Sequence, residues 1–301
     1  MRPDIFDRRS ADLPRPVLPH RSRLLARLCA LTFTLTFPFT SHAYPPAPYY
    51  TIFGVVRDQV GATLNVEGAV IKLLRNGAEI GSAAIQTGVL LDQNYEIKIR
   101  IDQTRDGTRT YSTSAVAPQG LFSLKVTMNS QDFYPIEASG TLRAGNGGEK
   151  VRLDLNLGID ANQDGLPDAW QEWQLHQAGR VPGTPGWDLG LITKNGDFDG
   201  DGTSNFLEYL AGTFAGDATE RFELRMLGKT PAVVSFEFYA ITGKVYAIEQ
   251  SADLRNWTTV PLATAPGGPA AAYHRASAVG VLPAYVAATD GESRFYRLTV
   301  R

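Results

Sequence analysis

Short runs in which apolar and polar residues alternate occupy the two outer parts of the chain. The clearest is Tyr95–Ile101, where tyrosine and isoleucine alternate with glutamate, lysine and arginine. A period of two residues places every second side chain on the same face, as in a β-strand with one buried face. Similar runs occur in the first part at 50–56, 69–74, 121–126 and 151–157.

Turn residues separate these runs. Asn76-Gly77, Asp106-Gly107 and the glycine-rich segment 145–148 lie between neighbouring runs. Asn, Asp and Gly favour tight turns because they tolerate left-handed backbone angles. Roughly eight strands in about 110 residues predict an antiparallel β-sandwich over residues 50–157.

The alternation returns near the end of the chain. Runs at 234–238 and 245–249 flank a turn at Gly243. In the last run, Phe295–Val300, we expect the apolar side chains at alternate positions to point inward. These runs predict a second β-sandwich over 216–301.

The segment between these two parts has helical periodicity. Leu166, Trp170 and Trp173 recur at a spacing that places them on one face of a helix, and Pro167 suits its first turn. A second apolar stripe, made of Phe206, Leu207 and Leu210, falls within 204–211. We therefore predict a mainly β protein in which two β-sandwich domains flank a small helical module. We place that module at residues 158–215.

The first 43 residues have the pattern of a secretory signal. A basic segment at 21–27 precedes twelve largely apolar residues at 28–39, and Ala43 ends a small-residue cleavage motif. A membrane anchor is the alternative reading, but spanning a bilayer needs ~20 apolar residues. We expect cleavage after about Ala43, a proline-rich linker at 44–49, and a secreted or cell-surface protein. The single cysteine, Cys29, lies in the signal, so the mature chain has no disulfide.

The net charge of the mature chain argues against some classes of binding partner. The first 43 residues hold seven arginines and three acids, which leaves 22 basic and 28 acidic side chains and a net charge of −6. This balance argues against nucleic acid or an anionic membrane as the main partner. The acidic residues are concentrated in two clusters inside the helical segment.

The later cluster is the sequence DFDGDGTSNFLE, residues 197–208. Oxygen-bearing side chains occupy positions 1, 3, 5, 9 and 12, and Gly202 at position 6 permits a sharp turn. The backbone carbonyl at position 7 adds a further oxygen. Ca²⁺ takes six to eight oxygen ligands, and a dication would turn the repulsion between these carboxylates into attraction. The alternative is an acidic surface loop that caps a helix. The predicted ligands are Asp197, Asp199, Asp201, Thr203, Asn205 and Glu208.

The earlier cluster, residues 160–171, repeats the arrangement with one difference. Position 12 is Gln171, and the next acid, Glu172, comes one residue later. Fewer negative ligands predict weaker binding, unless Glu172 turns inward or a ligand comes from elsewhere in the chain. The alternative is a polar turn whose aspartates cap the following helix. The predicted ligands are Asp160, Asn162, Asp164, Leu166 through its carbonyl, and Asp168.

These loops resemble known calcium-binding repeats. The first resembles thrombospondin type 3 repeats, and the second resembles dockerin and related EF-hand-like loops of secreted bacterial proteins. The resemblance implies that Ca²⁺ is a structural ion. The loops start at Asp160 and Asp197, farther apart than tandem dockerin repeats, which argues against a cohesin-type partner.

The two β regions carry shorter resemblances. The segment 54–73 resembles the start of carboxypeptidase-regulatory-like or other immunoglobulin-like modules. The segment 243–257 and the FYRLTV end resemble a C-terminal β module of large secreted bacterial proteins, for which no activity is implied. These likenesses favour an immunoglobulin-like form for the two predicted sandwiches.

No catalytic motif stands out in the mature sequence. It has two histidines, His176 and His274, and no nucleophile motif, phosphate loop or zinc spacing. We expect a secreted, non-enzymatic calcium-binding protein whose ion stiffens the junction between two β domains. Two alternatives stay open. One is a carbohydrate-binding or adhesive surface component with a polysaccharide or cell-surface protein partner, for which Trp257 is a candidate contact. The other is a secreted hydrolase with a carboxylate pair.

Overall fold

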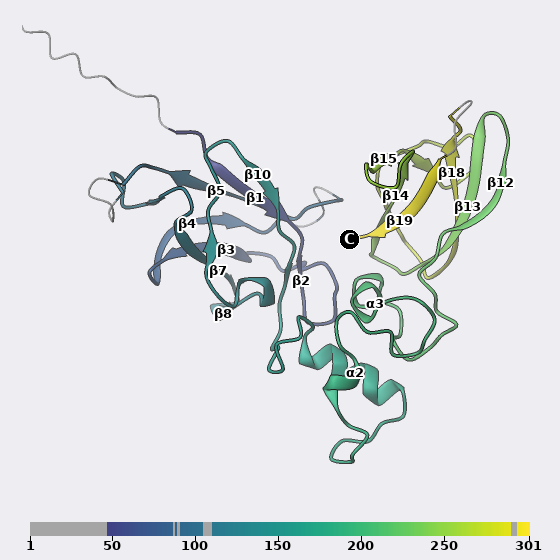
Figure 1. Cartoon of the computed structure of the whole chain (residues 1–301), viewed down its shortest axis with the longest axis horizontal. Helices are drawn as coiled ribbons and strands as arrows, with labels where there is room; N and C mark the ends of the chain where they lie inside the picture. The colour runs from purple at the N-terminus through teal and green to yellow at the C-terminus, as the bar shows by residue number, and fades with distance from the viewer. Residues whose placement is uncertain (1–46, 87, 89–90, 105–109, 290–293) are drawn as a thin grey trace, which may run out of the picture. The chain divides into compact units, whose positions relative to one another are not determined.

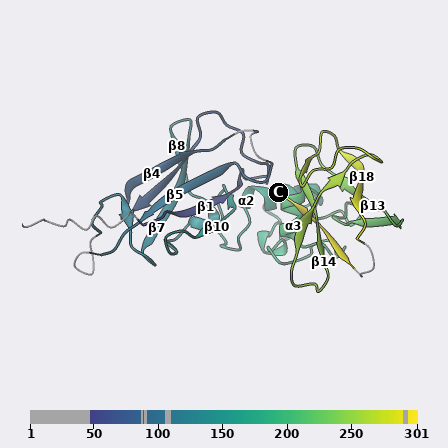
Figure 2. The ribbon, with the colours of Figure 1, turned by 90° about the horizontal axis from the view of Figure 1, so that it is seen from above.

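The computed structural model describes residues 47–301 except 87, 89–90, 105–109 and 290–293. The signal predicted over 1–43 lies outside the described residues. The described chain is mainly β, with several antiparallel sheets and few helices (Figures 1 and 2). The mainly β character predicted from the sequence is thus confirmed. Neither helix in the described ranges is long and apolar enough to cross a membrane.

The first β region forms one four-stranded sheet, one five-stranded sheet and one short strand pair. Their orders are β10-β1-β5-β6, β4-β3-β7-β8 with β9 beside β7, and β11-β2. Most pairs are antiparallel, as expected, but β1–β10, β5–β6 and β2–β11 are parallel. The elements are β1 (Tyr50–Gly54), β2 (Val56–Arg57), β3 (Val70–Arg75), β4 (Ala78–Ala84), β5 (Tyr95–Ile101), β6 (Ala115–Val116), β7 (Leu121–Met128), β8 (Gln131–Phe133), η1 (Ile136–Ala138), β9 (Leu142–Arg143), β10 (Lys150–Arg152) and β11 (Leu155–Asn156).

Alternation and turn chemistry explain these strands. In β5, the tyrosine and isoleucines are buried and the charged residues between them are not. The β3–β4 hairpin turns at Asn76 and Gly77, which both have positive φ, as the sequence predicts. Strands of both larger sheets contribute to one hydrophobic core, which includes Ile52, Ile97 and Leu124.

The helical segment follows without an intervening strand. It contains α2 (Asp168–Gln177), η2 (Leu189–Leu191) and α3 (Asn205–Ala211). Leu166 and Trp170 are fully buried in its own small core, whereas Trp173 is 40 % exposed and lies at the core's edge against Phe214. The indole of Trp170 meets the ring of Tyr209 edge-on at 5.5 Å between centroids, which joins α2 to α3.

The last β region forms two further sheets. Their orders are β12-β13-β18-β16 and β15-β14-β17, with β19 also paired to β14. Val300 is buried, and Tyr296 and Leu298 pack against the core, so the inward direction predicted for them is confirmed. The strands are β12 (Arg225–Lys229), β13 (Val233–Ala240), β14 (Val245–Ser251), β15 (Thr258–Val260), β16 (Leu262–Ala263), β17 (His274–Arg275), β18 (Gly280–Ala287) and β19 (Phe295–Val300).

One turn of the first β region contacts both later regions. The hydroxyl of Tyr209 on α3 donates a hydrogen bond to the carbonyl oxygen of Asp58 at 2.9 Å. The ammonium group of Lys244, in the β13–β14 turn, donates to the carbonyl oxygen of Gly61 at 2.7 Å. We call residues 58–62 the docking turn. It connects the first β region to α3 and to the last β region.

Candidate metal centre

The second acidic loop folds around its own backbone. The carboxylate of Asp197 accepts hydrogen bonds from the backbone N–H groups of Gly200 and Gly202, at 2.8 and 2.9 Å. Both glycines have positive φ, which lets the chain turn sharply enough to present these groups. The N–H of Gly202 is the main reason that the pKa of Asp197 lies below its usual range. The first carboxylate is therefore fixed in the loop in its charged form.

The next two aspartates each use one oxygen and leave the other without a partner. Asp199 accepts from the N–H of Asp201 at 3.1 Å, and Asp201 accepts from the N–H of Thr203 at 2.6 Å. The second carboxylate oxygen of each is buried and has no hydrogen-bond partner among the described residues. Carboxylate oxygens of Asp197, Asp199 and Asp201 lie within 4.8 Å of one another. Three negative groups thus converge on one small volume.

Glu208 completes this cluster from the first turn of α3. Ser204 caps the helix, since its hydroxyl accepts from the N–H of Leu207. The side chain of Glu208 is fully buried, and neither of its oxygens has a hydrogen-bond partner in the described part of the chain. Burial is the main cause that raises its pKa to about 8, followed by the charges of Asp199, Asp201 and Asp197. Burying a charged carboxylate without a partner is costly, so the metal-free side chain holds a proton below about pH 8 and would lose it to a cation that compensates its charge.

Asn205, the ligand predicted at position 9, has a hydrogen bond at each end of its side-chain amide. Its amide oxygen accepts from the N–H of Phe198 at 3.0 Å, and its amide nitrogen donates to the carbonyl of Thr193 at 2.7 Å. The residue is fully buried, and both ends of its amide are in use. Asn205 therefore fixes the loop against the preceding segment.

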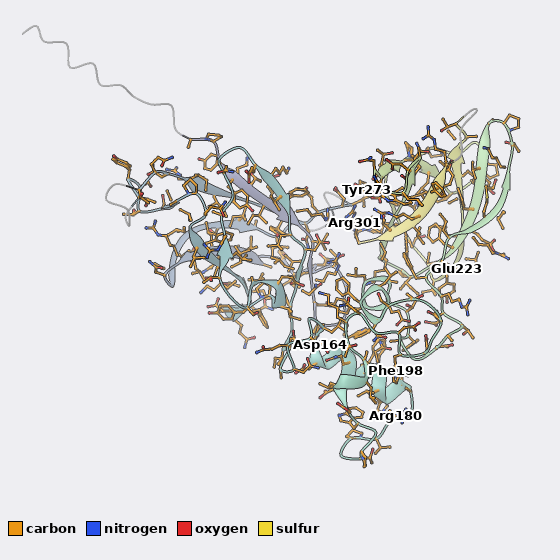
Figure 3. All side chains as sticks on the ribbon, in the orientation of Figure 1. Asp164, Arg180, Phe198, Glu223, Tyr273 and Arg301 are labelled. Carbon is orange, nitrogen blue, oxygen red and sulfur yellow. The ribbon has the colours of Figure 1, made fainter. Side chains whose placement is uncertain are left out.

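The aspartates of the first acidic loop accept hydrogen bonds from groups of the same loop, although the side-chain oxygen of Gln171 is buried without a partner. Asp160 accepts from the N–H groups of Asp164 and Gly165 at 3.1 and 3.0 Å, and Asp168 accepts from the N–H of Ala161. Asp164 (labelled in Figure 3) accepts from Leu166 N–H and from the side chains of Asn162 and Gln171. Within the described ranges, its acidic side chains do not form a compact group like that of the second loop. The sequence-predicted ligands therefore lie in two differently organised loops.

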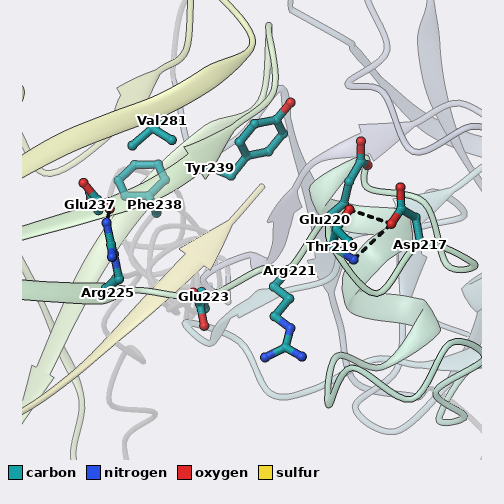
Figure 4. Close-up of a pocket in the computed structure, with 10 residues that line it drawn as sticks. All are labelled: Asp217, Thr219, Glu220, Arg221, Glu223, Arg225, Glu237, Phe238, Tyr239 and Val281. Atoms are coloured by element: carbon teal, nitrogen blue, oxygen red, sulfur yellow. Dashed lines mark hydrogen bonds and ion pairs between the residues drawn. The ribbon is translucent and has the colours of Figure 1, made fainter.

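A third group of charged residues lines an open cavity in the last β region. The cavity has a volume of about 490 Å³ and is shown in Figure 4. Three of its carboxylates have partners: Asp217 accepts from the N–H and hydroxyl of Thr219, Glu220 accepts from the N–H of Phe214, and Glu237 pairs with Arg225. Glu223 is exposed. These groups behave as solvated surface charges, in contrast to Glu208.

The other candidate side chains from the sequence are Trp257, His176 and His274. The guanidinium of Arg297 lies 4.3 Å from the ring centroid of Trp257, so it covers one face of the indole that a sugar could use. His176 is exposed in the last turn of α2. Burial lowers the pKa of His274, which pairs with Tyr246 in a strand register. Within the described ranges, no side-chain hydrogen bond or ion pair links either histidine to a carboxylate or another group that could act with it in acid–base catalysis.

The acidic cluster around Glu208 is thus the one site in the described chain that combines convergent carboxylates with buried carboxylate oxygens lacking a hydrogen-bond partner. Sequence reasoning identified the loop but not the role of Asn205. No sequence pattern marks that role, because it depends on a hydrogen bond from Asn205 to the carbonyl of Thr193, which only the fold brings close. Comparison with known proteins gave no match to any family model, curated protein or solved structure.

Proposed function

We propose that the protein is a secreted, non-enzymatic calcium-binding modular protein, in which one Ca²⁺ at the second loop stiffens the segment that joins the two β regions. The observation that carries the proposal is Glu208. Its carboxyl group is fully buried, and no described group donates a hydrogen bond to either oxygen. A buried carboxyl group is protonated, paired with a cationic side chain or bound to a metal, and no cationic side chain forms an ion pair with this one among the described residues. A dication would compensate Glu208 and the three neighbouring aspartates together.

The donor chemistry fits Ca²⁺. The aspartates at positions 1, 3 and 5, the carbonyl of Thr203 and the two oxygens of Glu208 would provide six oxygens if each aspartate gave one. Ca²⁺ takes six to eight oxygen ligands, and a bidentate glutamate at position 12 is typical of EF-hand loops. Because the amide of Asn205 is in use, a water molecule would serve at position 9, as is frequent in such loops. The absence of histidine and cysteine from this set disfavours zinc or copper.

The position of Glu208 suggests what the ion would do. Glu208 precedes Tyr209 on α3, and the Tyr209 hydroxyl binds the docking turn through Asp58. Fixing Glu208 to the loop would fix the helix and hold this hydroxyl in place. An ion that binds only the folded state at 100 times its dissociation constant adds about 2.7 kcal/mol of stability. Calcium would thereby strengthen the attachment of the first β region.

The test is calcium titration of the purified chain by calorimetry, with limited proteolysis in parallel. We expect Ca²⁺ to bind, and we expect the segment 175–200 to be cut faster in chelator than in calcium. Glu208→Gln should abolish the binding and the protection together. Glu223→Gln removes the same charge from an exposed position and should leave both unchanged.

Two results would reject the proposal. One is a titration without heat or bound metal for the folded wild-type chain. The other is a Glu208→Gln variant that binds calcium as tightly as the wild type, because that would place any binding elsewhere.

A further inference from the structure

In the first acidic loop, a side-chain amide donates a hydrogen bond to a carboxylate oxygen that a cation would otherwise bind. The side-chain nitrogen of Gln171, at position 12 of that loop, donates to a carboxylate oxygen of Asp164 at 2.6 Å. The same nitrogen donates to the carbonyl of Ile192 at 2.8 Å, which fixes the orientation of the amide. Gln171 is fully buried. It therefore presents N–H groups, rather than an oxygen, to the place where position 12 of the second loop presents a carboxylate.

Lys194 adds a positive charge beside the same loop. Its side chain and those of Asp160 and Asp164 line one open groove. A Cβ atom built on Gly165, the glycine at position 6, would lie 3.2 Å from the Lys194 nitrogen. The equivalent glycine of the second loop, Gly202, has nothing within 4 Å of such an atom. The same ammonium lies 4.2 Å from the ring centroid of Phe206, so it stands between the two segments, but only in the first loop does it approach the glycine at position 6. A cation approaching the first loop from this side would be repelled by it.

The neighbouring acid does not replace the missing one. Glu172 is exposed on α2, whereas Gln171 is buried. Turning Glu172 inward would require the helix to rotate and would remove the bond from Gln171 to Ile192. The inward side of position 12 is thus taken by an amide that is anchored elsewhere in the core.

We propose that the first loop keeps its shape without metal, with Gln171 and Lys194 in place of the ion, so that the protein binds one Ca²⁺ rather than two. This inference rests on the proposed function, because it assumes that the second loop is the calcium site. According to this proposal, the residue at position 12, Gln171, determines whether the loop is held together by hydrogen bonds or by a metal ion. Glutamate at this position would offer two oxygens to a cation and would repel the carbonyl of Ile192 in the absence of one.

The experiment counts calcium ions per chain by calorimetry and by metal analysis after gel filtration in calcium. We expect one ion for the wild type and none for Glu208→Gln. We expect two for the double variant Gln171→Glu, Lys194→Gln, which removes both internal substitutes. Combining that double variant with Glu208→Gln should restore one ion, now at the first loop. Calcium should raise the melting temperature of this combined variant, which Glu208→Gln alone should not show.

Matched controls keep the inference open to refutation even if a variant does not fold. Glu172→Gln and Asp164→Asn, made singly in the wild-type chain, should leave one bound ion. Two ions in the wild type, or loss of an ion in either control, would overturn the inference while the proposed function stands. A folded double variant that gains no second ion would also overturn it. No bound ion in the folded wild type would instead reject the proposed function.

Discussion

The side-chain nitrogen of Lys244 lies 2.7 Å from the carbonyl oxygen of Gly61, a residue 183 positions earlier in the chain. Lys244 is 7 % exposed, and Gly61 belongs to the docking turn. Burial lowers the pKa of Lys244 to about 7, the charge of Arg57 adds to this effect, and that of Asp58 opposes it. An amine in this state can keep its hydrogen bond to Gly61 after it loses its charge.

This contact predicts a pH dependence of stability. The pKa of a lysine in the unfolded chain is near 10.4. Between about pH 7 and pH 10 the unfolded chain therefore binds more protons at this position than the folded chain. Stability contributed by Lys244 should rise with pH across this window and be lowest below pH 7, with a slope of at most about 1.4 kcal/mol per pH unit.

Lys244→Met removes the titrating group and keeps an unbranched side chain. Urea unfolding of both proteins at pH 6.5, 8 and 9.5 checks the prediction. The free energy of unfolding of the wild type should increase relative to that of the variant as the pH rises. Parallel profiles would show that Lys244 titrates normally in the folded state.

Tyr209 provides a second test of the docking turn. Its hydroxyl donates to Asp58 and lies 3.4 Å from the amide oxygen of Asn156. Tyr209→Phe should lower the free energy of unfolding by about 0.5–1.5 kcal/mol, the usual net contribution of a hydrogen bond. Tyr134→Phe is the matched control, since Tyr134 is 59 % exposed, and it should change stability by less than about 0.5 kcal/mol. Equal effects of the two substitutions would contradict a role for Tyr209 in docking.

Gly61 itself has no room for a side chain. Its φ is +81°, and a Cβ atom would lie 2.3 Å from the carbonyl oxygen of Tyr209. Gly77 has a similar φ of +77° but open space around it. Gly77→Ala should therefore show only the backbone cost of about 1–2 kcal/mol. Gly61→Ala should be clearly more destabilising in the same urea experiment, because the docking turn must also move away from α3. A loss no larger than that of Gly77→Ala would count against close packing there.

Glu208 predicts that metal-free stability and calcium affinity change with pH in opposite directions. Its pKa is raised to about 8 in the folded chain, against about 4.3 for an unfolded glutamate. Between these values the folded chain binds more protons, so the stability of the metal-free protein should fall as the pH rises. Calcium must displace that proton, so its apparent affinity should increase with pH up to about 8, by at most tenfold per unit.

Calcium titrations at pH 6, 7 and 8, paired with unfolding in chelator, check both directions. Two aspartates beside the site have shifted pKa values in opposite directions: that of Asp197 is lowered by the N–H of Gly202, and that of Asp199 is raised by burial. Glu208→Gln should lose the pH dependence of metal-free stability over this range. An affinity that is flat from pH 6 to 8 would be incompatible with a proton on Glu208.

The local pattern of the sequence predicts the strands well, because one buried face imposes a period of two. It fails where burial is decided by distant partners. In α3 the apolar stripe of Phe206, Leu207 and Leu210 is only half-buried, whereas Asn205 and Glu208 are fully buried. These two polar residues are inside because one anchors Thr193 and the other faces the aspartates. Neither relationship leaves a periodic signal in the sequence.

The same limit applies to the acidic loops, where spacing predicts the types of ligand but not the contacts of individual side chains. Spacing alone identifies the ligand types at positions 1, 3, 5 and 12 of the second loop, because those types follow from the needs of an ion. The use of the Asn205 amide, and the bond from Gln171 to Ile192, depend on a segment that lies between the loops in sequence and against both in space. The docking contacts of Tyr209 and Lys244 join residues more than 150 positions apart, which pattern analysis cannot pair.

Helix α2 carries a second buried amide, that of Gln174, whose oxygen accepts a hydrogen bond from the backbone N–H of Ala215 at 2.9 Å. Ala215 belongs to no helix or strand and is itself fully buried. Its amide hydrogen should accordingly exchange with deuterated solvent as slowly as those of the neighbouring helix, and only when the small core around Trp170 opens. In an exchange experiment, this irregular segment would thus report on the cooperative opening of the whole helical region.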